Sequence, residues 1–573
     1  MQNSARISFS KFFRHVKQLK QRKFSASASV RKNEEWIIHS PYKDAVIPNM
    51  RFLDRLWKES KSFQNNVALE CAETKKQYTY NQLQHYMAVF ATSLRRKLGL
   101  QQGDVVAAML PNNPEFVVVS FGALQAGCVM TTINPIYKEL EISHQVSTTE
   151  PKLIVTNPEC YEAVVKGLAI AKNNAKIVLV DGPDAKIPEG VIRYSEIAEK
   201  GEVDYKFLDT IEVKLEDTAF IPFSSGTTGL PKGVDISYKN LLAAIEIMQN
   251  KNHCFPQLAH GDFQDVVPCV LPFFHIYGLV VTLIGHLSMG CKLITLNKFS
   301  TGLFFDVLSR DKVSLLYVVP PIAILLGKHQ DVKPEFFRNM RHIVCGAAPL
   351  AATDAEAVLK RSERHFEFNQ GYGATETTSL TTTIPIRAKD VDYNSCGIAM
   401  SSVKLKFVDP QTGKTVPIGE SGEMYVQSPT VMRGYYKNEK ATKESLTEDG
   451  FFKTGDMGYY DPKKGLFITD RIKELIKVKG MQVAPAELES ILRSHPAVVE
   501  AAVIGVPHDF NGESPKAFVV KKNGLSVSPE EIQDYVAGKV ASFKKIEEVV
   551  FVEDIPKNMT GKILRKELKK MYA

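Results

Sequence analysis

Between residues 36 and 460, short apolar runs alternate with longer stretches of helical periodicity. The apolar runs have the length of buried strands, and stretches such as 115–125 and 240–248 repeat apolar residues with the period of a helix. Strands that alternate with helices form mostly parallel sheets covered by helices. We therefore predict a large α/β body over residues 34–469. Its clearest strands are expected at 105–110, 153–156, 177–180, 219–223, 315–319 and 343–345.

The pattern changes near residue 470, where about a hundred residues form a compact αβ pattern of their own. Pro485 stands at the start of a helix with Leu488 and Leu492 on one face. Residues 528–531 read Ser-Pro-Glu-Glu, which is a capping box with proline at the first helical position. The sequence therefore predicts a second, smaller α+β domain over residues 470–573.

The net charge of +8 lies almost entirely at the N-terminus. Nine of the 72 Lys and Arg residues lie in residues 1–33, which contain no Asp or Glu. The rest of the chain is nearly neutral, which argues against nucleic acid as a partner.

Residues 1–33 are also amphipathic and rich in serine, as mitochondrial presequences are. An arginine at position 22 predicts cleavage after Phe24. We expect a mitochondrial matrix location; a disordered basic tail on a cytoplasmic or peroxisomal protein is the alternative.

Two further patterns exclude classes of protein. The eight cysteines are scattered without a C-x-x-C pair, so we expect them to be reduced and mostly buried. No run of ~18 or more uncharged apolar residues occurs, so no transmembrane span is expected.

The most specific motif follows the predicted strand at 219–223. Residues 224–234 read Ser-Ser-Gly-Thr-Thr-Gly-Leu-Pro-Lys-Gly-Val, a loop rich in N–H and O–H donors with one cation. Such a loop can wrap a polyphosphate, although it lacks the spacing of a Walker loop. A plain Ser/Gly/Thr turn is the alternative. The predicted phosphate-binding residues are Ser224, Ser225, Gly226, Thr227, Thr228, Gly229 and Lys232.

This loop resembles the phosphate-binding signature of the adenylate-forming superfamily, which includes acyl-CoA synthetases, 4-coumarate:CoA ligases and firefly luciferase. Four other motifs occur in the family's order between about Leu53 and Leu568, so the resemblance covers nearly the whole chain after the N-terminal segment. The resemblance implies a large N-terminal AMP-binding body and a mobile C-terminal lid, with the active site between them. It also implies an ATP-dependent acid:CoA ligase that uses ATP, Mg²⁺ and coenzyme A to activate a fatty or aryl carboxylic acid through its acyl-adenylate.

Two motifs of the body resemble the family's substrate and nucleotide walls. Residues 271–279 read Leu-Pro-Phe-Phe-His-Ile-Tyr-Gly-Leu and resemble the substrate-channel segment, in which His275 would orient the carboxylate and Tyr277 would line the pocket. By periodicity alone, His275 would be an ordinary core histidine. The walls that contact the adenine and the acid would be formed by Gly346, Ala347, Gln370, Gly371, Tyr372, Gly373 and Thr375. Glu376 would bind Mg²⁺, a hard ion held by few carboxylates and by phosphate oxygens, and Thr227 would assist it.

The remaining motifs lie around the predicted domain boundary and near the C-terminus. Asp456 resembles the family's ribose clamp, and Arg471 with Lys473 would lie at the nucleotide and the hinge. Lys477 and Gln482 would lie near AMP and the acyl carbonyl, while Lys479 and Gly480 would face coenzyme A. A solvated lysine edge is the alternative for this segment. Lys562, in the loop 556–566, resembles the lysine that catalyses adenylation.

Other readings of these motifs stay open. A carrier-protein-loading enzyme would share the adenylation step, and a luciferase-like oxygenase would share the motifs. A catalytically inactive nucleotide-binding protein is disfavoured because Glu376, Asp456, Arg471 and Lys562 are all present. Many relatives carry an aromatic residue at the position of Val478, a departure on the expected coenzyme A side. Neither the acid's chain length nor the oligomeric state is indicated by the sequence.

Overall fold

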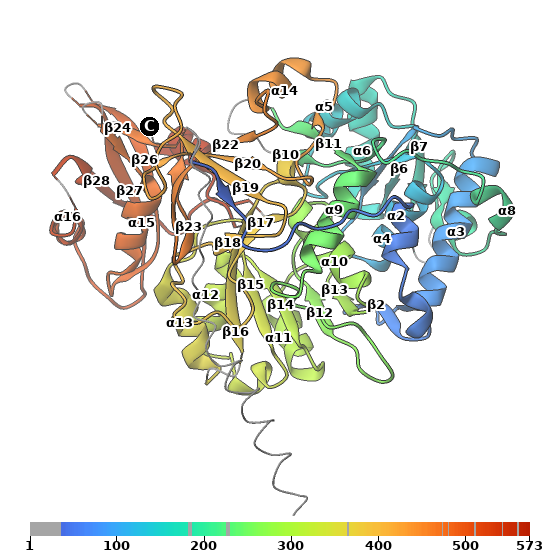
Figure 1. Ribbon diagram of the computed structural model, residues 1–573, viewed down its shortest axis with the longest axis horizontal. Helices are drawn as coiled ribbons and strands as arrows, with labels where there is room; N and C mark the ends of the chain where they lie inside the picture. The colour runs from blue at the N-terminus through green and yellow to red at the C-terminus, as the bar shows by residue number, and fades with distance from the viewer. Residues whose placement is uncertain are drawn as a thin grey trace, which may run out of the picture.

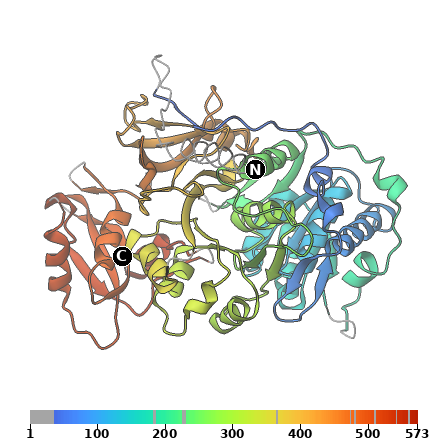
Figure 2. The ribbon, with the colours of Figure 1, turned by 60° about the horizontal axis from the view of Figure 1, so that its bottom comes forward.

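The computed structural model has a large body and a smaller C-terminal unit, coloured orange to red at one side of the body in Figures 1 and 2. The structure describes residues 36–181, 186–224, 230–363, 366–472, 474–478, 481–508, 511–540, 542–558 and 561–572. The C-terminal unit lies next to the yellow segment that contains α12 (Pro320–Lys328) and α13 (Ala352–Arg361).

The largest sheet has nine strands, and the strand order along its main path is β10-β11-β9-β5-β4-β6-β7-β8, with β21 paired to β11. Along this path, β9, β5, β4, β6, β7 and β8 are parallel to one another, and helices or longer crossover segments connect them in sequence order. The strands are β4 (Val105–Met109), β5 (Val129–Thr132), β6 (Leu153–Thr156), β7 (Lys176–Leu179), β8 (Ile192–Arg193), β9 (Thr218–Ile221), β10 (Phe223–Ser224), β11 (Lys232–Ser237) and β21 (Gly434–Tyr435). The principal helices are α3 (Tyr80–Arg96), α4 (Pro114–Gln125), α5 (Glu139–Thr149), α6 (Pro158–Ala171) and α9 (Tyr238–Met248).

Two further sheets complete the parallel part of the body. One has the order β12-β13-β2-β3 and the other β14-β15-β16-β17-β18, and the pairs β12–β13, β13–β2, β14–β15 and β15–β16 are parallel. The strands are β2 (Val67–Cys71), β3 (Gln77–Thr79), β12 (Val266–Cys269), β13 (Lys292–Thr295), β14 (Leu315–Val318), β15 (His342–Cys345), β16 (Glu367–Gly373), β17 (Leu380–Thr383) and β18 (Ile398–Ala399). A π-helix, η2 (Tyr277–Ile284), continues into the short α10 (Gly285–Leu287), and α11 (Thr301–Arg310) follows β13.

The end of the body departs from the expected alternation of strands and helices. Its sheet, of order β1-β19-β20-β22-β23, is antiparallel throughout. In β20, buried and half-buried residues alternate, because one face of an antiparallel sheet packs on the core while the other is more open. The strands are β1 (Ile38–His39), β19 (Lys404–Val408), β20 (Gly422–Gln427), β22 (Phe452–Asp461) and β23 (Gly465–Arg471), and α14 (Glu439–Ser445) lies between β21 and β22.

The C-terminal unit has a hydrophobic core of its own, which includes Val483, Leu488, Leu492 and Ile532. The predicted capping box is present at the start of α16, where the Ser528 hydroxyl and the Glu531 side chain each accept a backbone N–H. The unit contains β24 (Ile476–Val478), β25 (Met481–Val483), α15 (Pro485–Arg493), β26 (Val498–His508), β27 (Gly512–Lys521), α16 (Pro529–Ala537), β28 (Glu548–Phe551) and α17 (Arg565–Tyr572). A large α/β body with a smaller α+β unit is the predicted fold class, which the structure confirms.

All eight cysteines are free, and six of them are buried, as the sequence predicts. Among the described residues, no helix combines the length and the hydropathy needed to cross a membrane.

Candidate active site

Glu376 lies at the centre of a buried polar contact between three segments of the body. It belongs to the turn that follows β16, and Ser224 and Tyr435 end β10 and β21. The Ser224 hydroxyl donates to Glu376 Oε1 at 2.8 Å, and the Tyr435 hydroxyl donates to the same oxygen at 2.9 Å. Among the residues that the structure describes, no donor contacts Oε2. The two hydrogen bonds to Oε1 therefore orient the carboxylate, and Oε2 is available to a cation.

Tyr435 also connects this carboxylate to Lys232, whose Nζ lies 4.8 Å from the centre of the tyrosine ring. The sequence interpretation missed Tyr435, because no spacing relates it to Glu376. Between Ser224 and Lys232, the predicted phosphate-binding residues Ser225, Gly226, Thr227, Thr228 and Gly229 lie outside the described residues.

Asp456 and Arg471 are directly opposite each other on the antiparallel strands β22 and β23. The Arg471 Nε lies 3.2 Å from Asp456 Oδ1, and the Tyr372 hydroxyl donates to Asp456 Oδ2. Burial, followed by the charge of Asp456, raises the pKa of Tyr372 well above its usual value, so its hydroxyl stays a donor. Each carboxylate oxygen retains a second lone pair, so Asp456 can still accept a diol.

Three residues predicted to line the acid pocket lie together. A Cβ added to Gly346 would lie 3.4 Å from the Tyr277 ring and 3.3 Å from the backbone oxygen of Gly371. A side chain at Gly346 would therefore fit tightly where these segments approach each other. Nearby, Ala347 has the left-handed φ of 71°, which turns the chain after β15.

The other residues of the predicted nucleotide wall have structural contacts. The Gln370 amide donates to the backbone oxygen of Tyr393, and a Cβ on Gly373 would lie 2.5 Å from the Ser379 backbone oxygen. Thr375 is buried beside Glu376. These three residues fix the backbone of the wall.

Asn112 shapes the segment that carries His275. Its buried Nδ2 donates to the backbone oxygens of Cys269 and Leu271 at 2.8 and 2.7 Å, and its Oδ1 accepts the Phe273 N–H at 2.7 Å. The sequence interpretation missed this residue, which lies in a loop after β4 with no motif around it.

The His275 imidazole is neutral at pH 7 and has a defined tautomer. Burial, with a smaller contribution from the charge of Lys562, lowers the pKa of His275 to about 4. The Tyr277 backbone N–H donates to His275 Nδ1 at 3.4 Å. Because Nδ1 accepts, the proton of the neutral ring lies on Nε2, which can donate to a carboxylate.

Lys562 comes from the C-terminal unit, in a turn that packs against α12. Gly561 has a φ of 76°, and a Cβ there would lie 2.7 Å from ring carbons of Pro321. The Lys562 N–H donates to Asn558 Oδ1 at 2.9 Å, which closes the turn. The pKa of Lys562 is lowered to about 8, first by burial and then by the charge of Arg471, while Glu474 and Asp456 act in the opposite direction. The charge of Lys562 therefore acts on His275, and the charges of Asp456 and Arg471 act on Lys562.

Two of the remaining predicted residues, Lys477 and Gln482, lie on the paired strands β24 and β25 of the C-terminal unit. Lys477 is exposed on β24 and pairs through its backbone with Gln482 on β25. Lys473, Lys479 and Gly480 lie outside the described residues.

Comparison with known proteins identifies the family. The model of the AMP-binding enzyme family matches residues 56–436, and that of the AMP-binding enzyme C-terminal domain matches residues 487–562. A 4-coumarate–CoA ligase of Humulus lupulus is 36% identical over 544 residues, which cover 94% of this chain and 96% of the relative. A probable 4-coumarate–CoA ligase of Dictyostelium discoideum is 36% identical over 92% of this chain and 97% of its own length. Among solved structures, ATP-bound MatB from Rhodopseudomonas palustris is 29% identical with a TM-score of 0.81, covering 91% of this chain and 99% of that one. The chain belongs to the AMP-binding enzyme family, within the adenylate-forming superfamily.

Proposed function

We propose that this chain is an AMP-forming acid:CoA ligase that acts on a carboxylic acid with an apolar tail, and the names of its relatives favour an aryl tail. One observation carries the proposal. The turn that carries Lys562 packs against Pro321 of the body, the charge of Lys562 lowers the pKa of His275, and the charges of Asp456 and Arg471 act on Lys562. A donor for a carboxylate, a cation and an acceptor for a ribose diol thus surround one site.

In the first step, the substrate carboxylate accepts a hydrogen bond from His275 Nε2 and attacks the α-phosphorus of ATP. A C–O–P bond forms, the bond between the α-phosphorus and the bridging oxygen breaks, and pyrophosphate leaves. The Lys562 ammonium neutralises negative charge that accumulates in this transition state. Asp456 holds the ribose hydroxyls, and Gly346, Gly371 and Tyr277 line the tail of the acid.

Glu376 is the residue that would hold Mg²⁺ in this site. One of its oxygens is fixed by Ser224 and Tyr435, and the other has no donor among the described residues, which suits a cation that also takes phosphate oxygens. Mg²⁺ bound there would neutralise phosphate charge. Thr227 would assist, as the resemblance implies.

In the second step, the coenzyme A thiol attacks the acyl carbon, a thioester forms and AMP leaves. We assign the approach of coenzyme A to the segment with Lys477, Lys479 and Gly480, and Gln482 and Lys473 to the nucleotide side, after a rotation of the C-terminal unit about residues 470–473. Lids that reorient between steps are common in enzymes.

The test is an assay of both products. Purified protein with ATP, Mg²⁺ and coenzyme A is expected to release pyrophosphate and form acyl-CoA with cinnamate-type or fatty acids, in equal amounts. Pyrophosphate without thioester would indicate a carrier protein or oxygen as the acceptor instead. The absence of both products with every acid would contradict the ligase assignment.

Replacing Asp456 with alanine is expected to raise the KM for ATP by roughly 10- to 100-fold, since hydrogen bonds to a charged group contribute about 1.5–3 kcal/mol. The measurement is pyrophosphate release against ATP concentration, alongside a thermal melt. Asp461→Ala, at the far end of the same strand, is the control. An unchanged ATP dependence in Asp456→Ala would refute the role in ribose binding.

The pH dependence of adenylation follows from the Lys562 amine, whose pKa is lowered to about 8. Above this pH the amine loses its charge, so kcat/KM for pyrophosphate release is expected to fall as pH rises through about 8, since this quantity reports the free enzyme. Lys562→Arg keeps its charge at every accessible pH and should move that decline to higher pH. A decline at the same pH in both proteins would assign it to another group.

We also propose that residues 1–24 direct the protein to the mitochondrial matrix. A reporter fused after these residues is expected to accumulate in mitochondria, because a basic amphipathic segment suits import. The matched control replaces Lys11, Arg14 and Lys17 with glutamate and should stay in the cytosol. Equal cytosolic distribution of both fusions would reject the proposed location.

A further inference from the structure

A largely buried arginine, Arg565, follows Lys562 closely in the sequence and is the first residue of α17. Its Nη1 donates to Glu474 Oε2 at 2.9 Å, its Nη2 donates to Glu489 Oε1 at 2.6 Å, and its Nε donates to the backbone oxygen of Val503 at 3.2 Å. The arginine side chain is 14% exposed. All three guanidinium nitrogens are therefore engaged, in a planar fork that a single ammonium group cannot reproduce.

The loop that carries Lys562 is a short hairpin with Arg565 at its base. The Leu564 N–H donates to the backbone oxygen of Pro556 at 2.8 Å, and the Asn558 N–H donates to that of Lys562 at 2.9 Å. We call this segment, residues 556–558 and 561–564, the lysine hairpin. Because these bonds hold its two sides together, a contact that fixes the base also limits where the lysine can lie.

The two carboxylates that bind Arg565 come from different parts of the C-terminal unit. Glu489 lies on α15, is 4% exposed, and also accepts a backbone N–H from β26 at 2.8 Å. Glu474 directly follows residues 470–473, about which the unit is proposed to rotate, and its N–H donates to the Arg471 backbone oxygen at 2.9 Å. Arg565 therefore joins the base of the lysine hairpin both to α15 and to the first residues after the proposed pivot.

Glu474 also affects the protonation of Lys562. Burial is the largest cause of the lowered pKa of this lysine, and the negative charge of Glu474 opposes that effect by favouring the ammonium form. The charged groups that act on this pKa are Arg471, Glu474, Asp456 and Arg565. The pKa of Lys562 therefore depends both on how deeply the lysine hairpin is seated and on the charge of Glu474.

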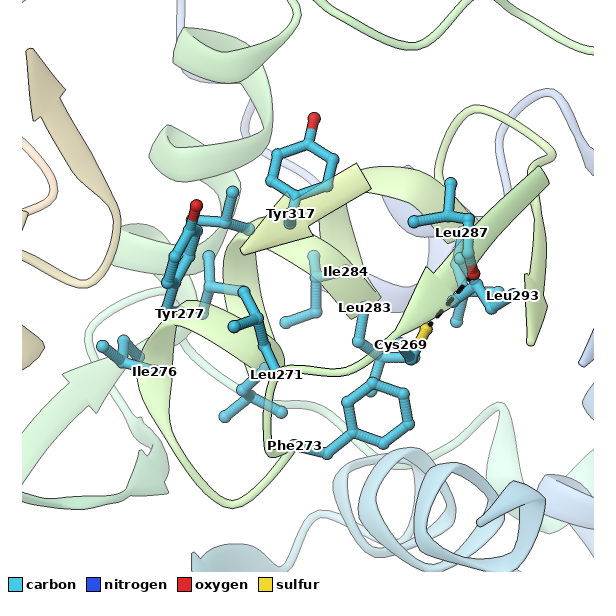
Figure 3. Close-up of a cluster of buried hydrophobic side chains, with 14 of the residues drawn as sticks. Cys269, Leu271, Phe273, Ile276, Tyr277, Leu283, Ile284, Leu287, Leu293 and Tyr317 are labelled. Carbon is cyan, nitrogen blue, oxygen red and sulfur yellow. Dashed lines mark hydrogen bonds between the residues drawn. The ribbon is translucent and has the colours of Figure 1, made fainter. Parts of the chain in front are cut away.

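On the side of the body, the charge of Lys562 acts on His275. His275 directly precedes Ile276 and Tyr277, whose side chains lie at one edge of the buried cluster in Figure 3. His275 thus belongs to a packed segment of the body. The position of Lys562 relative to it depends on how the C-terminal unit holds the lysine hairpin.

We propose that Arg565 is a positioning residue for adenylation: by binding Glu474 and Glu489 together, it holds the lysine hairpin so that the Lys562 ammonium meets the α-phosphate. The inference rests on the proposed ligase function and adds a residue to it. Arg565 contacts no reactant and acts through Lys562. The alternative is an arginine that only stabilises the C-terminal unit, and this alternative predicts equal effects on both half-reactions.

Arg565→Lys is the principal test, because lysine keeps the charge but cannot bind both carboxylates and the Val503 oxygen at once. Pyrophosphate release without coenzyme A is expected to lose ~10- to 100-fold in kcat, the scale for a displaced catalytic group. The KM values for ATP and the acid should stay within about twofold of the parent, since the lost interaction belongs to the transition state. Thioester formation from preformed acyl-adenylate should stay close to the parent rate. Equal loss in both half-reactions, or no loss in either, would overturn the proposal.

The pH profile supplies a measurement that partial unfolding would not change. In Arg565→Lys a displaced lysine hairpin is less buried, so the pKa of Lys562 rises and the fall of kcat/KM for pyrophosphate release moves to higher pH. Glu474→Gln keeps an acceptor for Arg565 but removes the charge that favours the ammonium, so the fall moves to lower pH. A fall at the parent pH in both variants would contradict the proposal.

Glu487→Gln is the matched control. Glu487 lies on the same helix as Glu489, but its two oxygens accept from Lys544 Nζ at 2.8 and 2.7 Å. This variant removes an ion pair of α15 that does not involve Arg565, so both half-reactions and the pH profile should match the parent. The same adenylation defect in Glu487→Gln as in Arg565→Lys would assign the effect to the stability of α15 and reject the positioning role.

Chemical labelling separates a failure of this inference from a failure of the ligase function. If the parent releases no pyrophosphate with any acid, the ligase function is wrong. The rate at which acetic anhydride labels Lys562, measured against pH by mass spectrometry of its peptide, still reports the pKa of the amine. A higher labelling pKa in Arg565→Lys and a lower one in Glu474→Gln, each relative to the parent and Glu487→Gln, would support the contact. The same labelling pKa in all four proteins would reject it.

Discussion

Replacing Lys562 with alanine is expected to slow acyl-adenylate formation by ~10²–10³-fold, the usual loss when one electrostatic donor to a transition state is removed. The same variant, given preformed acyl-adenylate and coenzyme A, should form thioester at nearly the parent rate. This separation follows from the proposed site, in which the charge of Lys562 acts on His275 and Arg471 near the reacting carboxylate and α-phosphate, because the second step forms no bond to phosphorus.

The two half-reactions are measured separately, by pyrophosphate release without coenzyme A and by thioester formation without ATP. Lys569→Ala, an exposed lysine of α17, is the control and should leave both rates unchanged. Equal impairment of both half-reactions by Lys562→Ala would show that the lysine has a structural role or that the C-terminal unit does not reorient between steps.

Gly561→Ala is expected to reduce adenylation by roughly 10²-fold or more without removing any charge. The left-handed backbone costs alanine about 1–2 kcal/mol. Its Cβ would also meet the Pro321 ring at 2.7 Å, and overpacking of this kind costs about 1–3 kcal/mol. Both costs destabilise the conformation in which the turn that carries Lys562 packs against α12, so the variant would hold Lys562 in the site less often.

Gly524→Ala is the matched control, because Gly524 has the same left-handed conformation, with a φ of 81°, and nothing within 4 Å of an added Cβ. It should carry the backbone strain and leave adenylation close to the parent. If Gly561→Ala and Gly524→Ala reduce adenylation equally, contact with Pro321 does not position the lysine.

The parallel part of the body was predictable because buried strands are short, apolar and separated by helices. The run 153–156 coincides with β6, and 343–345 lies within β15. The antiparallel sheet β1-β19-β20-β22-β23 was not predicted, because a half-exposed strand such as β20 mixes polar and apolar residues and has a weak signal. The π-helix after Ile276 was also beyond sequence reasoning, since a uniformly apolar segment has no periodicity to distinguish helix types.

The candidate site was predictable where a residue lies in a motif. His275, Glu376, Asp456, Arg471 and Lys562 each stand in a motif that resembles a family signature. Tyr435 and Asn112 have no such surroundings, and each acts through a contact that only the fold creates: with Glu376 for the first and with the backbone of residues 269–273 for the second. Hydrogen bonds between segments that are distant in the sequence leave no local pattern.

The opposition of Asp456 and Arg471 across β22 and β23 has a thermodynamic consequence. Arg471 is the last residue of its strand, and the C-terminal unit follows directly. If the unit rotates as proposed and moves Arg471 away from Asp456, the carboxylate that binds the ribose would lose its ion-pair partner, and the nucleotide would bind different orientations of the unit with different affinities. By linkage, that difference would equal the free energy with which bound nucleotide biases the orientation. One ion pair on a sheet edge would thereby couple nucleotide occupancy to domain orientation.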